Sequence, residues 1–105
     1  MRGARFVLTP AAARDLNDIW DYIANDSTEA ASRVLDALES AMVKLARNPG
    51  AGHWREDLVD KRHRFLLVYS YLIVYRNGTK PLQIIRILHA ARDVQGILAL
   101  PPQEL

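Results

Sequence analysis

The sequence predicts an α+β fold, in which a helical hairpin packs on one face of a small, twisted, mostly antiparallel β-sheet. Two stretches between residues 10 and 47 carry apolar residues at helical spacing, and the link between them fits only an antiparallel hairpin. Downstream, Asn-Gly at 77–78 separates two β-type segments. The predicted order is β-α-α-β-β-β, then a short helix. With 105 residues, half of them apolar, the chain suits one domain (1–105), with a core at about 5–97 and a tail at 98–105.

The first strand and the first helix have clear local signals. A short apolar stretch at 5–8 predicts the strand. Thr9 then supplies an N-cap, and Pro10 takes the first helical position, where its missing N–H costs nothing. Apolar residues recur at helical spacing, with Trp20 beside them, and the opposite side carries Arg14, Asp15, Asp18 and Asp21. This helix should end near Asn25.

The second helix is predicted to begin at Asp26, because Glu29 three residues later completes a pattern that resembles a capping box. Its apolar stripe consists of Ala31, Val34, Leu35, Leu38, Met42 and Leu45. The helix should end at Arg47–Asn48, because Pro49-Gly50 cannot continue it.

Three strands are predicted in the second half of the chain, at residues 65–68, 71–76 and 82–89. A loop anchored by Trp54 and a basic run at 61–64 lead into the first of them. Asn77-Gly78 predicts a hairpin, since both residues tolerate φ > 0. The link at Tyr69–Ser70 has no Gly or Asn. Arg92-Asp93 opens a short helix, which Pro101-Pro102 ends.

Alternation along the last strand places Arg86 in an apolar row. Leu82, Ile84 and Leu88 would share its face, and Gln83, Ile85, Ile87 and His89 would lie on the other. Two interpretations of Arg86 stay open. It either snorkels or forms a structural ion pair, for which Asp93 is a partner, or it recognises a phosphate or carboxylate through its planar fork.

Other polar and aromatic residues of the predicted sheet also have two interpretations. His89 is either a satisfied structural group or an acid or base, and the three histidines show no metal-ligand spacing, so no metal site or cofactor is expected. Tyr69, Tyr71 and Tyr75 either stack on bases or pack across strands. The basic residues Lys61, Arg62, Arg64 and Arg76 either line a partly open sheet face or protect an edge strand from aggregation.

Composition excludes several classes of protein. The chain has no cysteine, so disulfides and thiolate metal sites are excluded. It shows no signal peptide and no apolar run long enough for a membrane span, which predicts a soluble cytoplasmic protein without membrane contact. The net charge is only +2, yet residues 53–93 hold 8 Lys/Arg against 4 Asp/Glu. This surplus either attracts nucleic acid or an acidic polypeptide, or it is ordinary solvated surface.

No Walker loop, dinucleotide fingerprint, nucleophile elbow or zinc-protease motif occurs in the sequence. The catalytic scheme within reach is metal-free RNA cleavage, which needs a base, an acid and cations around the phosphorane. Glu56, His63 or His89 could supply the acid and base. Arg64 and Arg86 could stabilise the charge.

Five segments are informative together: LTPAAARDLNDIWDYIA, NPGAG, RHRF, YLIVYR and RILHAARD. In this order and spacing, over about residues 5–97, the chain resembles the RelE/ParE superfamily of bacterial type II toxins. RelE-like members cut messenger RNA on the ribosome, whereas characterised ParE-like members mostly block DNA gyrase. The long helical hairpin and HAARD resemble the ParE branch. RelE-like nucleases often carry a Tyr or His near the last strand; His89 stands there, but Ala90 and Ala91 follow it without a neighbouring tyrosine. This departure favours binding of a protein target.

The resemblance implies the partners and the site residues. A ParD-like or similar antitoxin would wrap the toxin, and the complex would set the oligomeric state. The contacts expected with the antitoxin are Leu16, Trp20, Leu38, Met42 and Arg76, and those expected with gyrase are Arg64, Arg86, His89 and Arg92. In the alternative, a ribosome-dependent nuclease acting on messenger RNA, Arg64, Arg86 and His89 would be catalytic. A third hypothesis is a member that binds its antitoxin but is no longer toxic.

Overall fold

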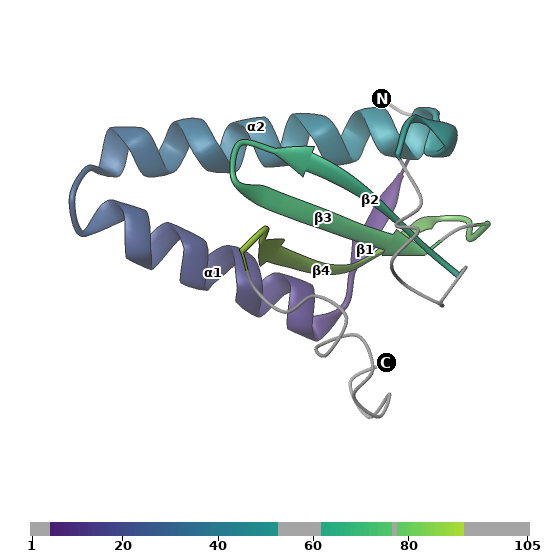
Figure 1. Cartoon of the computed structure of the whole chain (residues 1–105), viewed down its shortest axis with the longest axis horizontal. Coiled ribbons are helices and arrows are strands. Elements are labelled where there is room, and N and C mark those ends of the chain that lie inside the picture. The colour runs from purple at the N-terminus through teal and green to yellow at the C-terminus, as the bar shows by residue number, and fades with distance from the viewer. Residues whose placement is uncertain (1–4, 53–61, 77, 92–105) are drawn as a thin grey trace.

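The computed structural model describes residues 5–52, 62–76 and 78–91. A hairpin of two helices, α1 (Pro10–Ala24) and α2 (Thr28–Arg47), packs on a four-stranded sheet (Figure 1). The strands are β1 (Phe6–Leu8), β2 (His63–Val68), β3 (Tyr71–Arg76) and β4 (Leu82–His89), and a short 3-10 turn, η1 (Pro49–Ala51), follows α2. The α+β prediction is therefore confirmed. The expected loop around Trp54 and the helix at Arg92-Asp93 lie outside the described residues.

The two helices begin at side-chain caps. The Thr9 hydroxyl accepts a hydrogen bond from the backbone N–H of Ala12 at 3.1 Å, as its place before Pro10 predicts. The predicted cap of the second helix was wrong by one residue. Asp26 still belongs to the end of α1, because its N–H donates to the carbonyl of Ile23. Ser27 is the extended residue, and its hydroxyl accepts from Ala30 N at 3.0 Å.

The sheet order is β1-β4-β3-β2, in which only the β1–β4 pair is parallel. The helical hairpin returns the chain to the end where β1 starts, so β2 runs in the direction of β1, and the two antiparallel connections that follow leave β4 parallel to β1. The β2–β3 link is a two-residue turn, with Tyr69 in the left-handed region at φ 54°. The β3–β4 connection covers residues 77–81, which makes it longer than a two-residue Asn-Gly turn. It contains Gly78 at φ 87° and a cis Lys80–Pro81 bond.

A β-bulge changes which residues of β4 face the helices. Val74 pairs with Arg86 and Tyr75 pairs with Ile84, so Ile85 is the extra residue. The expected strict alternation is therefore wrong beyond Ile84. Ile87 joins Ile84 against the helices, and Ile85 lies with Leu88 in a separate apolar cluster.

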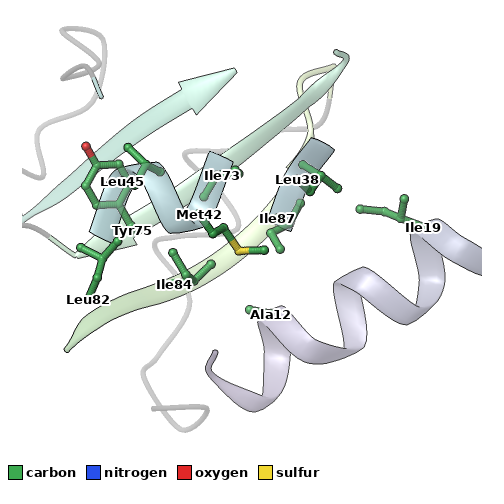
Figure 2. Close-up of a cluster of buried hydrophobic side chains, with 10 residues drawn as sticks. All are labelled: Ala12, Ile19, Leu38, Met42, Leu45, Ile73, Tyr75, Leu82, Ile84 and Ile87. Atoms are coloured by element: carbon green, nitrogen blue, oxygen red, sulfur yellow. The ribbon is translucent and has the colours of Figure 1, made fainter. Parts of the chain in front are cut away.

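The main core lies between the hairpin and the sheet, where side chains from both layers point toward one another (Figure 2). Its buried members are Ala12, Ile19, Leu38, Met42, Leu45, Ile73, Tyr75, Leu82, Ile84 and Ile87. Burial of each large aliphatic side chain contributes about 1.5 to 3 kcal/mol. The stripe predicted for the second helix supplies three of these residues, which is why the hairpin holds a fixed position on the sheet.

The other sheet face carries a second buried cluster, which consists of Phe65, Leu72, Val74, Ile85 and Leu88. The sequence predicted a partly open face here. Among the apolar side chains of β2, β3 and β4, only Leu67 is exposed, at 59%. Neither described helix combines the length and apolar character needed to cross a membrane.

Candidate functional site

Arg86 is held by a carboxylate on the first helix. Its Nε donates to Asp15 Oδ2 at 2.7 Å, and its Nη2 donates to Asp15 Oδ1 at 3.0 Å. Both side chains are largely buried, with 20% and 12% of their surface exposed. The prediction of Asp15 on the solvent side of the helix was therefore wrong, and the ion pair joins Arg86 to Asp15, whereas the predicted partner, Asp93, lies outside the described residues. The paired fork fits the structural interpretation of Arg86.

The same carboxylate also binds a backbone N–H at the edge of β4, beyond the point where the short strand β1 ends. Asp15 Oδ2 accepts from the backbone N–H of Ile87 at 2.9 Å. At the start of α1, the N–H and hydroxyl of Thr9 donate to the carbonyls of Ile84 and Ile85. The beginning of α1 therefore continues the hydrogen bonding of β1 and covers backbone groups that would otherwise be open.

Arg64 and Tyr75 fasten the turn after α2 to the sheet. The Arg64 guanidinium donates to the Gly52 carbonyl at 3.1 Å, and the Tyr75 hydroxyl donates to the Pro49 carbonyl and accepts from Gly52 N at 3.0 Å. Burial raises the pKa of the Tyr75 phenol above its ordinary value of 10.0, against the opposing effects of the Gly52 hydrogen bond and the Arg64 charge. Tyr75 is fully buried, so the packing interpretation holds for this tyrosine.

His89 lies at the exit of β4, directly across from Tyr71. The two rings meet edge to face, with centroids 5.6 Å apart. His89 is exposed, and its Nδ1 accepts from the backbone N–H of Ala91 at 3.1 Å, so the neutral imidazole carries its proton on Nε2. No tyrosine follows His89 in the sequence, but Tyr71 from the neighbouring strand lies beside it in the structure.

The structure does not bring Arg64 together with His89. Arg64 pairs with Tyr75, which pairs with Ile84, so Arg64 lies level with the start of β4. His89 pairs with Tyr71, four residues from Tyr75 along β3, which is about 13 Å at the usual strand rise. Arg92 lies outside the described residues, and those residues contain no group of three or more His, Cys, Asp or Glu that could hold a metal ion.

Comparison with known proteins assigns this architecture to a family. A family sequence model described as ParE toxin of type II toxin-antitoxin system, parDE, matches residues 6–94. The chain belongs to the ParE toxin family. It is 30% identical over 93 residues to Toxin ParE1 from Mycobacterium tuberculosis, in strain CDC 1551 and in strain H37Rv, and this covers 87% of the chain and 94% of the relative.

The fold agrees with this membership. A chain from the solved structure of the chromosomal ParDE TA system from P. aeruginosa superposes with a TM-score of 0.67, at 24% identity, over 82% of this chain and 95% of that one. The resemblance to the ParE branch of the RelE/ParE superfamily is thereby confirmed for family and fold. The chain is a ParE-type toxin of a type II toxin–antitoxin system.

The residues expected to contact an antitoxin divide into core and surface. Leu38 and Met42 are 0% and 2% exposed, so the expectation that they anchor a partner was wrong: they pack inside the core of this ParE-family fold. Leu16 is half-buried against the same core, and Trp20, one helical turn later, is 36% exposed. Arg76 is half-buried at the far end of β3. Leu16 and Trp20 remain as neighbours on α1 that a partner could reach.

Sequence reasoning missed Asp15, although a signal for it existed. Asp15 stands three residues after Ala12 and four before Ile19, both of which are buried, so it lies on the apolar stripe of α1. An acidic residue on such a stripe needs a cationic or N–H partner, because burying an unpaired carboxylate is costly. The contact by which Gly52 and Tyr75 fasten the turn after α2 was also missed, and the sequence around these two residues gives no comparable signal.

Proposed function

We propose that this chain inhibits bacterial growth by binding DNA gyrase and that a cognate antitoxin neutralises it. The observation that carries the proposal is the match of the ParE toxin family over residues 6–94, together with the curated relatives at 30% identity. A toxin with this target would act in the cytoplasm.

The arrangement of the candidate residues favours binding over RNA cleavage. Arg86 donates to Asp15, and Arg64 donates to the turn after α2. Arg64 lies far from His89 along the sheet, and the Arg86 fork is occupied by Asp15, which does not favour the arrangement of acid, base and cations that the nuclease scheme needs. Among the predicted target contacts, His89 is the exposed residue within the described part of the chain, and Arg92 follows it in the sequence.

One observation favours the alternative of a ribosome-dependent nuclease. Tyr71 and His89 present a phenol and an imidazole in direct contact, and both groups can transfer protons. In this alternative the pair would need cations from the ribosome or from residues beyond the described part.

The antitoxin would bind the helical hairpin. Leu16 and Trp20 offer an apolar anchor on α1, of the kind that a flexible amphipathic segment uses in groove binding. The similar P. aeruginosa chain comes from a structure of a ParDE system, which supports a ParD-like partner for this chain. The oligomeric state would then be that of the toxin–antitoxin complex.

Purified wild-type protein should inhibit supercoiling by gyrase and increase cleavage complexes. A His89→Ala protein of unchanged stability should be at least about tenfold weaker, as expected for an interface residue worth 1.4 kcal/mol or more. Unchanged gyrase activity at excess toxin would refute the target.

Two further assays separate the other hypotheses. Codon-positioned cuts in translated messenger RNA, lost in His89→Ala and in Tyr71→Phe, would establish the nuclease instead. If cells grow normally when the protein is induced without its antitoxin, the hypothesis of a member that binds its antitoxin but is not toxic would be supported.

A further inference from the structure

Most of the basic residues in the described part of the chain gather at one end of the fold. The seven acidic residues in the described part all lie in α1, in α2 or in the turn between them: Asp15, Asp18, Asp21, Asp26, Glu29, Asp36 and Glu39. Seven basic residues lie where α2 and β3 end and where β1, β2 and β4 begin. We name this group the basic pole, and it consists of Arg5, Lys44, Arg47, Arg62, Arg64, Arg76 and Lys80.

The register places these residues at one end of the fold. Leu82 N donates to the Arg5 carbonyl, and His63, next to Arg62, pairs with Arg76. The end of α2 joins them because the turn at Pro49–Ala51 is fastened to Tyr75 and Arg64. In Figure 1 the end of α2, the start of β1 and the β3–β4 connection all lie at the right, opposite the turn between the helices.

Most of the basic pole is accessible. Arg5, Lys44, Arg47 and Lys80 are exposed, and Arg76 is half-buried. Arg62 and Arg64 add charge but take part in contacts within the chain. Residues 53–61, between η1 and β2, contain two basic and three acidic residues, so their charges offset only one of the seven. Asp36 and Glu39 line a pocket together with Lys44 and Arg47, so the pole keeps a smaller net positive charge than its seven cations, although the whole chain carries only +2.

We propose that the basic pole binds the phosphate backbone of duplex DNA. A protein partner would need an apolar anchor, yet the exposed large apolar side chains of the described residues, apart from Val7, lie away from the pole: Trp20, Tyr22, Leu67 and Tyr69. A single strand would need aromatic platforms for its bases, and the described residues of the pole expose none. A contact with the phosphate backbone of a duplex needs only cations, and the planar fork of an arginine guanidinium suits a phosphate group.

Binding of a duplex by the pole does not depend on gyrase. The choice of DNA over RNA rests on the proposed function, since gyrase acts on DNA and a toxin bound beside it would meet the duplex. The pole and the exposed residues on α1 then serve different partners. The DNA contact would add to the affinity for a gyrase–DNA complex and leave Leu16 and Trp20 free for the antitoxin, while Arg76, expected from the sequence as an antitoxin contact, would contact DNA instead.

The test is a titration of a fluorescent 20-base-pair DNA duplex of arbitrary sequence with the purified toxin, followed by anisotropy at several salt concentrations. Binding in the micromolar range is expected at about 50 mM salt, and the logarithm of the affinity should fall with that of the salt with a slope between about −2 and −5. Arg47→Gln and Lys80→Gln should each bring the slope about 0.9 closer to zero. Circular dichroism confirms that each variant is folded.

The matched control is Arg33→Gln, which removes the same charge from the same helix about 21 Å from Arg47. It should leave both affinity and slope unchanged. The inference is overturned if no DNA binding is seen at toxin concentrations 100-fold above the micromolar range, or if Arg33→Gln and Arg47→Gln lose equal affinity. Tighter binding of an RNA duplex or of a polyglutamate peptide than of the DNA duplex would also overturn it. If the toxin binds DNA but has no effect on gyrase, this inference holds and only the gyrase target is refuted.

Discussion

Asp15 on α1 holds Arg86 on β4 across 71 positions of sequence, through two hydrogen bonds of 2.7 and 3.0 Å. The same carboxylate accepts the backbone N–H of Ile87. One acidic side chain therefore fixes the helix to the sheet and closes the sheet edge. Variants of Arg86 are expected to lose activity through instability, so a loss of toxicity in them does not identify a target contact.

We predict that Asp15→Asn lowers the free energy of unfolding by about 2 kcal/mol, since it leaves the largely buried guanidinium without its counter-charge. Asp18→Asn makes the same chemical change on the exposed side of the same helix and should alter stability by less than about 0.5 kcal/mol. Urea denaturation of both proteins measures the difference. Equal midpoints would show that the ion pair contributes nothing.

Gly52 leaves room for the ring of Tyr75. A Cβ at this position would lie 2.7 Å from Tyr75 Cε1 and 2.8 Å from Cζ, so Gly52→Ala should lower stability by about 2 kcal/mol or more. Gly52 has φ −80°, so the effect is steric and not conformational. In Gly50→Ala the nearest atom is Asn48 Oδ1 at 3.7 Å, and stability should be preserved. Thermal unfolding of the pair tests this, and a stable Gly52→Ala protein would contradict the close packing.

Tyr75 should make stability depend on pH in the alkaline range. Its folded pKa is raised above 10.0 by burial, so the folded state holds the phenol proton more tightly than the unfolded chain. This contribution is fully present below pH 10 and is lost as the pH rises through the folded pKa. The free energy of unfolding of the wild type should therefore fall more steeply above pH 10 than that of Tyr75→Phe, which has no phenol there to ionise. Parallel urea titrations from pH 8 to pH 11 measure the two slopes.

At pH 7 the same substitution has a separate cost. Tyr75→Phe removes the acceptor of Gly52 N–H and the donor to the Pro49 carbonyl, which should destabilise the fold by about 1 to 3 kcal/mol. Matching stabilities at pH 7 would mean that solvent replaces both hydrogen bonds.

Trp20 should contribute to antitoxin binding and Leu38 to folding. Trp20→Ala is expected to weaken the affinity for the cognate antitoxin by tenfold or more while the toxin stays folded. Leu38→Ala should instead cost about 2 to 5 kcal/mol of stability, because Leu38 is fully buried. Tyr22, two residues beyond Trp20, projects about 200° around the helix, so Tyr22→Ala is the surface control. Calorimetric titration would refute this assignment if Tyr22→Ala weakened binding and Trp20→Ala did not.

Local signals predicted most of the element boundaries. The strands at 71–76 and 82–89 have the expected bounds, and Thr9-Pro10 starts α1 as expected. These features depend on a few neighbouring residues: a cap within three positions, a φ fixed by proline, an alternation of period two. The cap at Ser27 was missed because Asp26 still belongs to the end of α1, where its backbone N–H donates to the Ile23 carbonyl. A single backbone hydrogen bond therefore decides which residue caps α2.

Register decided what local signals did not. The bulge at Ile85, the contact of Tyr71 with His89 and the separation of Arg64 from His89 all follow from how β3 pairs with its two neighbours. An inserted residue in one strand shifts every side chain after it to the other face, and no pattern within that strand records the shift.

By itself the sequence determined the two helices, the three-stranded meander, the apolar stripe of α2 and the resemblance to a toxin superfamily, since each depends on short-range backbone preferences or on the order of motifs. Only the tertiary structure decided which charges are paired, which apolar residues are accessible and where the cations gather. Asp15 meets Arg86, Met42 is enclosed and Arg5 lies at the same end as Lys80, because the hairpin and the strand pairing bring distant segments together. Such contacts depend on long-range geometry, which local preference does not encode.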